Sequence, residues 1–142
     1  MGYRSEVAYR IVFSNKQVLN EFIALVMMKG NEERKALSEC EIEVQDNGRE
    51  ECFVNFYAQD VKWYDGYEDV KGHHTLMENI VDWYPEGSAY YFLRIGEESD
   101  DVDEQHDGDD DFLDYVWSDM HVVRSLELPF SHSYKPIGDE LR

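Results

Sequence analysis

Positively charged residues are scarce in this chain. It has 13 Lys and Arg against 32 Asp and Glu among 142 residues, which gives a net charge of −19 at pH 7. Because phosphates are bound mainly by Lys and Arg, this imbalance argues against direct binding to nucleic acid. It also disfavours binding to an anionic membrane surface. Basic proteins and metal ions are the partners that this charge permits.

Long hydrophobic runs are also missing. The longest run, residues 22–28, is far too short to span a bilayer. Residues 1–6 are polar and are followed by a strand-like pattern, so we expect no signal peptide. These observations predict a cytoplasmic protein.

Cysteine is limited to Cys40 and Cys52, which flank the hairpin signal Asp46-Asn47-Gly48. Placing the apolar residues of both arms on one face pairs Ile42 with Val54 and Val44 with Cys52. In this register the two thiols lie about 13 Å apart, at roughly 3.3 Å per residue. A disulfide requires Cα atoms within about 7 Å, so we expect two buried free thiols in a reducing compartment.

Known motifs of catalysis and cofactor binding are absent. The chain has no glycine-rich phosphate loop, no G-x-S-x-G and no H-E-x-x-H. His73 and His74 stand at the beginning of an expected helix, where adjacent side chains point about 100° apart. We therefore interpret both as surface or capping residues rather than zinc ligands. The expectation is a protein without enzymatic activity, cofactor or metal site.

Apolar residues, by contrast, are plentiful. The chain is 42% hydrophobic and 14% aromatic, which excludes a disordered acidic protein. Its length suits one domain. We expect a single α+β domain over residues 1–130, with an acidic hairpin insert at residues 97–119 and a polar tail at residues 131–142.

The periodicity of the apolar residues predicts the elements of this domain. Residues 114–128 are ambiguous between helix and strand, and an interrupted strand is preferred. The expected elements are a strand at 7–13, a helix from 14–15 to about 30, a short helical turn within 31–39, hairpin arms at 40–45 and 51–64, a helix at 73–84, and a strand at 90–95. This order predicts a ferredoxin-like βαββαβ sandwich, in which two helices cover one face of an antiparallel sheet, with one or two extra C-terminal strands.

The acidic segment at residues 97–119 holds twelve acidic residues and no Lys or Arg. So dense a negative charge requires water, a cation or a basic partner around it. One interpretation is a solvated hairpin tip that improves solubility. The other is a surface that binds a basic protein, with carboxylates that imitate the phosphates of a duplex. The candidate binding residues are Glu97, Glu98, Asp100, Asp101, Asp103, Glu104, Asp107, Asp109, Asp110, Asp111 and Asp114.

Residues 103–114 of this segment nearly match a calcium-binding loop. Oxygen donors occupy loop positions 1, 3, 5, 9 and 12, and Gly108 stands at position 6. Gln105, Asp110 and Asp114 depart from the pattern at positions 3, 8 and 12. A calcium-binding module is therefore the alternative function. A nuclease that uses Mg²⁺ ranks lower, because the segment has no basic residue to receive nucleic acid.

Three stretches, MGYRSEV at 1–7, VKWY at 61–64 and RIGEE at 94–98, resemble a family of small, largely uncharacterised proteins of phages and prophages. The sequence Arg124-Ser125-Leu126 is similar as well. The resemblance implies an accessory protein in the host cytoplasm, and it brings no reaction or catalytic residues.

Together with the charge, the resemblance implies an anti-defence or host-takeover inhibitor. Its expected partner is a basic host protein that handles nucleic acid, such as a nuclease, a CRISPR complex or a polymerase. The few cations near the similar stretches have a separate interpretation: they form internal ion pairs that stabilise the sheet. These cations are Arg4, Lys62, Arg94 and Arg124.

Overall fold

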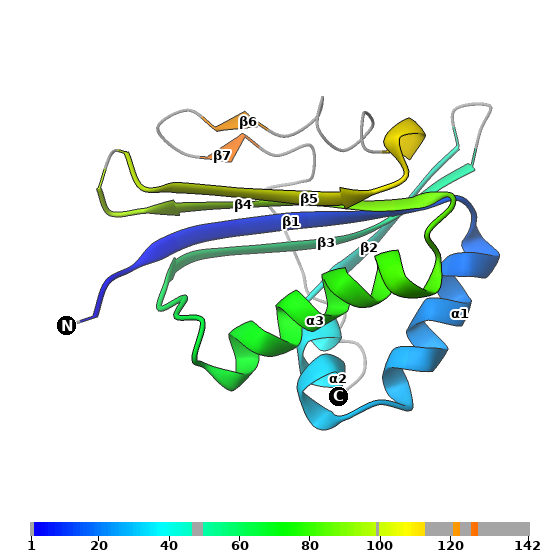
Figure 1. Cartoon of the computed structure of the whole chain (residues 1–142), viewed down its shortest axis with the longest axis horizontal. Helices are drawn as coiled ribbons and strands as arrows, with labels where there is room; N and C mark the ends of the chain where they lie inside the picture. The colour runs from blue at the N-terminus through cyan, green and yellow to red at the C-terminus, as the bar shows by residue number, and fades with distance from the viewer. Residues whose placement is uncertain (1, 47–49, 99, 113–120, 123–125, 128–142) are drawn as a thin grey trace.

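The computed structural model describes residues 2–46, 50–98, 100–112, 121–122 and 126–127 (Figure 1). Its centre is a five-stranded antiparallel sheet with the order β2-β3-β1-β4-β5. The strands are β1 (Ser5–Phe13), β2 (Glu41–Asp46), β3 (Glu50–Val61), β4 (Ser88–Gly96) and β5 (Val102–Gly108). The α+β class that the sequence predicts is confirmed.

Helices α1 (Lys16–Met27), α2 (Asn31–Ser38) and α3 (Glu68–Trp83) lie on the same side of the sheet (Figure 1). The side chain of Asn15 accepts a hydrogen bond from the Val18 amide at 3.0 Å, which caps α1 as expected. The sequence analysis expected two helices on this face and only a turn at residues 31–39. That turn is the eight-residue helix α2, which packs against α3.

The hairpin of β2 and β3 has the predicted register. Ile42 pairs with Val54 and Val44 pairs with Cys52. Both cysteines are buried and free, as expected. Residues 47–49, where the turn was predicted, lie outside the described residues.

The chain after β5 is described only in part. A helical turn covers residues 110–112, and β6 (His121–Val122) pairs with β7 (Leu126–Glu127) in a separate antiparallel sheet. The two short strands agree with the preferred interpretation of residues 114–128. The remainder of that stretch and the predicted polar tail at residues 131–142 lie outside the described residues.

Strand β1 is buried on both of its faces. The predicted alternation holds on the helix side, where Tyr9 and Phe13 join the main core. On the opposite side Ala8 and Val12 belong to a second apolar cluster, and Arg10 between them is 0% exposed. The central strand of the sheet therefore carries no solvent-facing side, although its sequence alternates like a half-buried strand.

The acidic segment is built into the sheet over residues 102–108. These residues form β5, which pairs with β4 from Val102–Ile95 to Gly108–Ala89. Of the described residues, only 97–98 and 100–101 lie between the two strands. The segment is thus not a hairpin tip over its described length, because seven of its residues form an edge strand. No helix of the described residues is long and apolar enough to cross a membrane.

Candidate functional site

Strand β5 places acidic side chains on both faces of one sheet edge. Asp103 lies opposite Arg94, and Asp107 lies opposite Tyr90. Opposed side chains of an antiparallel pair share a face, and Tyr90 packs on the helix-side core, so this face is the helix side. Glu104 faces the other way, where Tyr91 donates a hydrogen bond to it at 2.7 Å. The edge is therefore acidic from either side of the sheet.

Ten of the eleven candidate residues are described, and Asp114 lies outside the described part of the chain. Three of the ten are half-buried, namely Asp101, Asp103 and Asp109. The others are exposed: Glu97, Glu98, Asp100, Glu104, Asp107, Asp110 and Asp111. The structure therefore keeps most of the predicted surface in water, spread over the turn, β5 and the residues after it.

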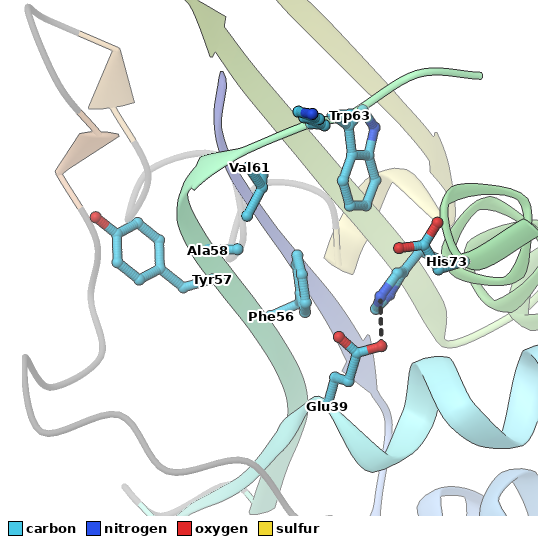
Figure 2. A pocket seen from close by; sticks show the side chains of 9 residues that line it. Glu39, Phe56, Tyr57, Ala58, Val61, Trp63 and His73 are labelled. Carbon is cyan, nitrogen blue, oxygen red and sulfur yellow. Dashed lines mark ion pairs between the residues drawn. The ribbon is translucent and has the colours of Figure 1, made fainter. Parts of the chain in front are cut away.

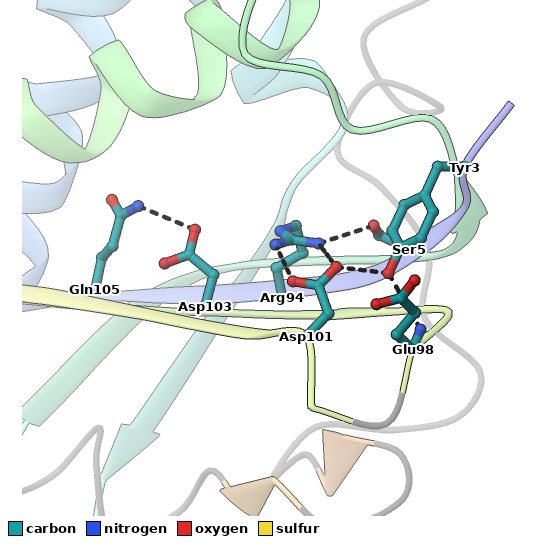
Figure 3. Close-up of polar contacts among 7 residues, drawn as sticks. All are labelled: Tyr3, Ser5, Arg94, Glu98, Asp101, Asp103 and Gln105. Carbon is teal, nitrogen blue, oxygen red and sulfur yellow. Dashed lines mark hydrogen bonds and ion pairs between the residues drawn. The ribbon is translucent and has the colours of Figure 1, made fainter.

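Asp101 is engaged inside the protein. Arg94 holds it with two hydrogen bonds of 2.8 and 3.1 Å, and the hydroxyl of Tyr3 donates a third at 2.6 Å (Figure 3). The Arg94 and Tyr3 hydrogen bonds lower the pKa of Asp101 to about 2. Asp101 was expected to contact a partner, but it connects the turn to β4 and to the N-terminus.

Asp109 has a structural role as well. Its carboxylate accepts hydrogen bonds from the amides of Gly87 at 2.8 Å and Asp111 at 3.0 Å. Its own amide donates to the carbonyl of Ser88 at 2.8 Å. These bonds tie the end of β5 to the beginning of β4. Asp101 and Asp109 are therefore poorly placed for a partner, and the exposed residues remain the candidates.

Residues 103–108 lie in an extended strand instead of the curled loop that the calcium-binding alternative requires, and Asp114 at loop position 12 lies outside the described residues. These residues are extended, so Asp103 and Asp107 lie about 13 Å apart along β5 at 3.3 Å per residue. Ligands of one Ca²⁺ ion stand about 2.3–2.6 Å from it, which requires a curled loop. Within the described residues no group of three His, Cys, Asp or Glu side chains is arranged to hold a metal ion.

A pocket of about 320 Å³ lies beside the acidic turn. We call it the Tyr64 pocket. Its aromatic walls are Tyr3, Trp63 and Tyr64, and its charged lining residues are Arg94 and the three carboxylates of Asp65, Asp101 and Asp103. The main-chain amide of Tyr3 donates to the Tyr64 hydroxyl at 2.7 Å, which fixes one ring against the N-terminal strand. This pocket extends the acidic edge toward α3.

A second pocket, of about 190 Å³, lies on the other side of Trp63. We call it the His73 pocket. Figure 2 shows the rings of Phe56, Trp63 and His73 facing one another, with Tyr57 turned away toward the other side of β3. The centroid of His73 is 4.2 Å from that of Phe56 and 5.4 Å from that of Trp63. His73 is only 1% exposed, so its interpretation as a surface or capping residue is wrong.

Helix α3 begins at Glu68, earlier than expected, which moves His73 from the helix end into the helix interior. There it shares a face with Leu76, Met77 and Ile80. The spacing i, i+3, i+4 and i+7 was visible in the sequence and could have placed this ring in the core.

Polar atoms around His73 form a buried chain. The Tyr9 hydroxyl lies 2.6 Å from Nδ1 of His73 and 3.3 Å from Sγ of Cys40, and Nε2 lies 3.6 Å from the carboxylate of Glu39. Burial raises the pKa of the Cys40 thiol to about 12. A neutral, inaccessible thiol is a poor nucleophile. This chain of contacts therefore satisfies polar groups of the core, and burial keeps the Cys40 thiol protonated.

The expected internal ion pairs are found for one of the four cations. Arg94 pairs with Asp101. Arg4 instead donates to the main-chain carbonyl of Asp60 at 3.2 Å, and Lys62 follows the end of β3 without an ion pair to a described residue. Arg124 lies outside the described residues. The sequence analysis missed a more deeply buried pair, Arg10 with Glu43 at 2.8 Å.

No protein-family model, no curated protein and no solved structure matches this chain. The functional argument therefore rests on the geometry and charge of the chain itself.

Proposed function

We propose that this chain is a non-enzymatic protein that binds and inhibits a basic, nucleic-acid-handling protein through its acidic sheet edge. One observation carries the proposal. Exposed carboxylates follow the turn, β5 and the residues after it, and none forms an ion pair with a described Lys or Arg, whereas the neighbouring Asp101 does. The uncompensated charge of this segment is thus concentrated at one edge of a folded sheet.

The charge density favours steering of a basic partner over close imitation of a duplex. Strand β5 carries Asp103, Glu104 and Asp107 on seven residues, which span about 23 Å at 3.3 Å per residue. A DNA duplex carries one charge per about 1.7 Å. Nucleic-acid mimicry would therefore need the acids of residues 97–101 and 109–111 as well. Long-range attraction requires only the summed field, which raises association rates.

The setting that we propose follows the resemblance to phage proteins: a host cytoplasm, and a nuclease, CRISPR complex or polymerase as the target. Direct contact with nucleic acid or a membrane is not part of the proposal, because the net charge opposes both. For the fold we propose a ferredoxin-like sandwich extended by β5. The order β2-β3-β1-β4 and the helical connections β1-α1-α2-β2 and β3-α3-β4 support it.

Capture from a bacterial lysate, with a matched pair of variants, tests the proposal. The first variant, Glu98→Gln with Asp100→Asn and Asp107→Asn, removes three exposed charges from the edge. The control, Glu68→Gln with Asp82→Asn and Glu86→Gln, removes three exposed charges from and near α3. Both change the net charge equally. We expect only the first variant to lose a basic protein identified by mass spectrometry.

Salt and activity give the second readout. The Debye length, over which exposed charges attract each other, shortens from about 10 Å at 0.1 M salt to about 3 Å at 1 M. Capture of the basic protein should therefore disappear at high salt. The captured protein should also bind or cleave its nucleic acid less well as this chain is added. Capture that persists in the first variant and at high salt would show that an uncharged face makes the contact.

A further inference from the structure

The Tyr64 pocket carries two carboxylates that have no ion pair with a described cation. Asp101 is compensated by Arg94, and the pair occupies one wall of the pocket. Among the described residues, Asp103 accepts one long hydrogen bond, from the Gln105 amide at 3.3 Å, and its attraction to Arg94 across the strand pair is shared with Asp101. Asp65 is exposed. Two negative charges therefore remain in the pocket. An anionic ligand would meet them, while the one arginine of the lining is already occupied.

The aromatic walls of this pocket are held in place before any ligand arrives. The Tyr3 hydroxyl donates to Asp101 and accepts from the Glu98 amide at 3.1 Å (Figure 3). Tyr64 accepts from the Tyr3 amide, and its ring meets Tyr67 edge-on at 5.1 Å. Rings fixed in this way lose little conformational freedom on binding, which favours recognition.

A planar cation matches both features. A guanidinium group forms forked hydrogen bonds with carboxylates and stacks on aromatic faces, and it is more weakly hydrated than an ammonium group. Its aliphatic stem can lie against ring surface. A pocket of about 320 Å³ is at the lower end of the range of small-ligand sites, about 300–1,000 Å³, which suits one side chain.

We propose that the Tyr64 pocket binds an arginine side chain of the basic partner, with the guanidinium at Asp65 and Asp103 and the stem on the aromatic walls. This inference rests on the proposed function, since it names the residue type that the acidic edge receives. The pocket is continuous with that edge through Asp101 and Asp103. It would act as the specific anchor, while the exposed carboxylates supply attraction at a distance.

The test uses N-acetyl-arginine amide as the probe and nuclear magnetic resonance as the readout. The indole N–H signal of Trp63, assigned with a Trp63→Phe variant, reports on the pocket wall. We expect a saturable shift with arginine amide and none with N-acetyl-citrulline amide, which has the same shape and no charge. Equal shifts with the two probes, or no shift with either, would overturn the proposal.

Three variants locate the binding site. Asp65→Asn and Asp103→Asn should each weaken arginine binding by roughly two- to fivefold, the range of exposed charge pairs. The control Asp82→Asn removes the same charge from an exposed position near the other end of α3 and should change the affinity little. An equal loss in all three variants would indicate the general field of the protein and would also overturn the proposal.

The outcome is separable from that of the proposed function. Failure of the pocket to bind arginine amide leaves capture of a basic protein by the exposed edge untouched. Loss of that capture leaves arginine binding in the pocket measurable.

Discussion

Two arginine–carboxylate pairs stabilise neighbouring strands in very different surroundings. Arg10 on β1 is 0% exposed, pairs with Glu43 at 2.8 Å and donates to the Asn55 side chain at 2.9 Å. Its guanidinium also lies 3.9 Å from the centre of the Phe53 ring. Arg94 on β4 pairs with Asp101 at the same distance, but the two side chains are 18% and 31% exposed.

The contrast separates a pair with a fully buried arginine from one that borders the proposed binding surface. Breaking the Arg10 pair would leave the buried Asn55 side chain without its donor and Glu43, only 23% exposed, without its cation, which is costly. Breaking the Arg94 pair would expose groups that water can reach. Each of these two arginines thus neutralises a carboxylate within the fold. The net negative charge of the protein is carried by the other acidic residues.

The largest expected effect comes from Arg10→Leu. The free energy of unfolding should fall by about 3–5 kcal/mol, because the buried Asn55 and the largely shielded Glu43 lose the arginine that both contact. Arg94→Leu should lower the free energy of unfolding clearly less. Urea unfolding of both variants measures the difference, and equal losses would mean that exposure does not distinguish the pairs.

A smaller effect is expected from Asp101→Asn, and it depends on pH. The pKa of Asp101 in the folded protein is about 2, below the value of about 3.9 in an unfolded chain. Its ionised form therefore contributes stability that is complete above about pH 4 and is lost as the pH falls toward about 2. The stability difference between the wild type and Asp101→Asn should shrink over this range.

The exposed neighbour Asp100 provides the control for that experiment. Asp100→Asn removes the same charge from an exposed position, so at pH 6 it should lower the stability less than Asp101→Asn does. A difference for Asp101→Asn that does not shrink between pH 4 and pH 2 would contradict the assignment of this pair.

The next effect in size is that of the carboxylates of the Tyr64 pocket on the pKa of His74. Burial lowers the pKa of His74, while the charges of Asp65, Glu78 and Asp103 raise it again. Asp103→Asn should therefore lower this pKa further, as seen in a titration of the imidazole signals by nuclear magnetic resonance. Asp82→Asn should leave the His74 titration unchanged. An unchanged pKa of His74 in Asp103→Asn would place Asp103 too far away to act.

The smallest effect on stability is expected for the binding-surface variant that combines Glu98→Gln, Asp100→Asn and Asp107→Asn. These side chains are exposed, and substitutions at such sites usually change stability by less than about 0.5 kcal/mol each. Thermal unfolding should therefore resemble that of the wild type. A marked loss of stability would identify these carboxylates as part of the fold instead of a surface for a partner.

The sequence predicted the elements that periodicity controls. The stripe that begins at Val18, with Asn15 as its cap, defined α1, and the alternation around the turn set the register of Val44 with Cys52. It placed the beginning of α3 too late, because Tyr67 at that N-cap makes no side-chain capping bond. The burial of Arg10 on β1 could not be predicted from the sequence, since a charged residue in an alternating strand usually faces water.

The amino-acid sequence determined the sign and amount of charge, the α+β class and the order of the main elements, because these follow from composition and short-range periodicity. Only the tertiary structure decided which carboxylates remain available to a partner. Asp100 and Asp101 are neighbours in the chain, yet the pairing of β5 with β4 and the return of Tyr3 to the turn engage only Asp101. The contact of Asp101 with Tyr3 joins residues 98 positions apart, so local patterns carry no record of it.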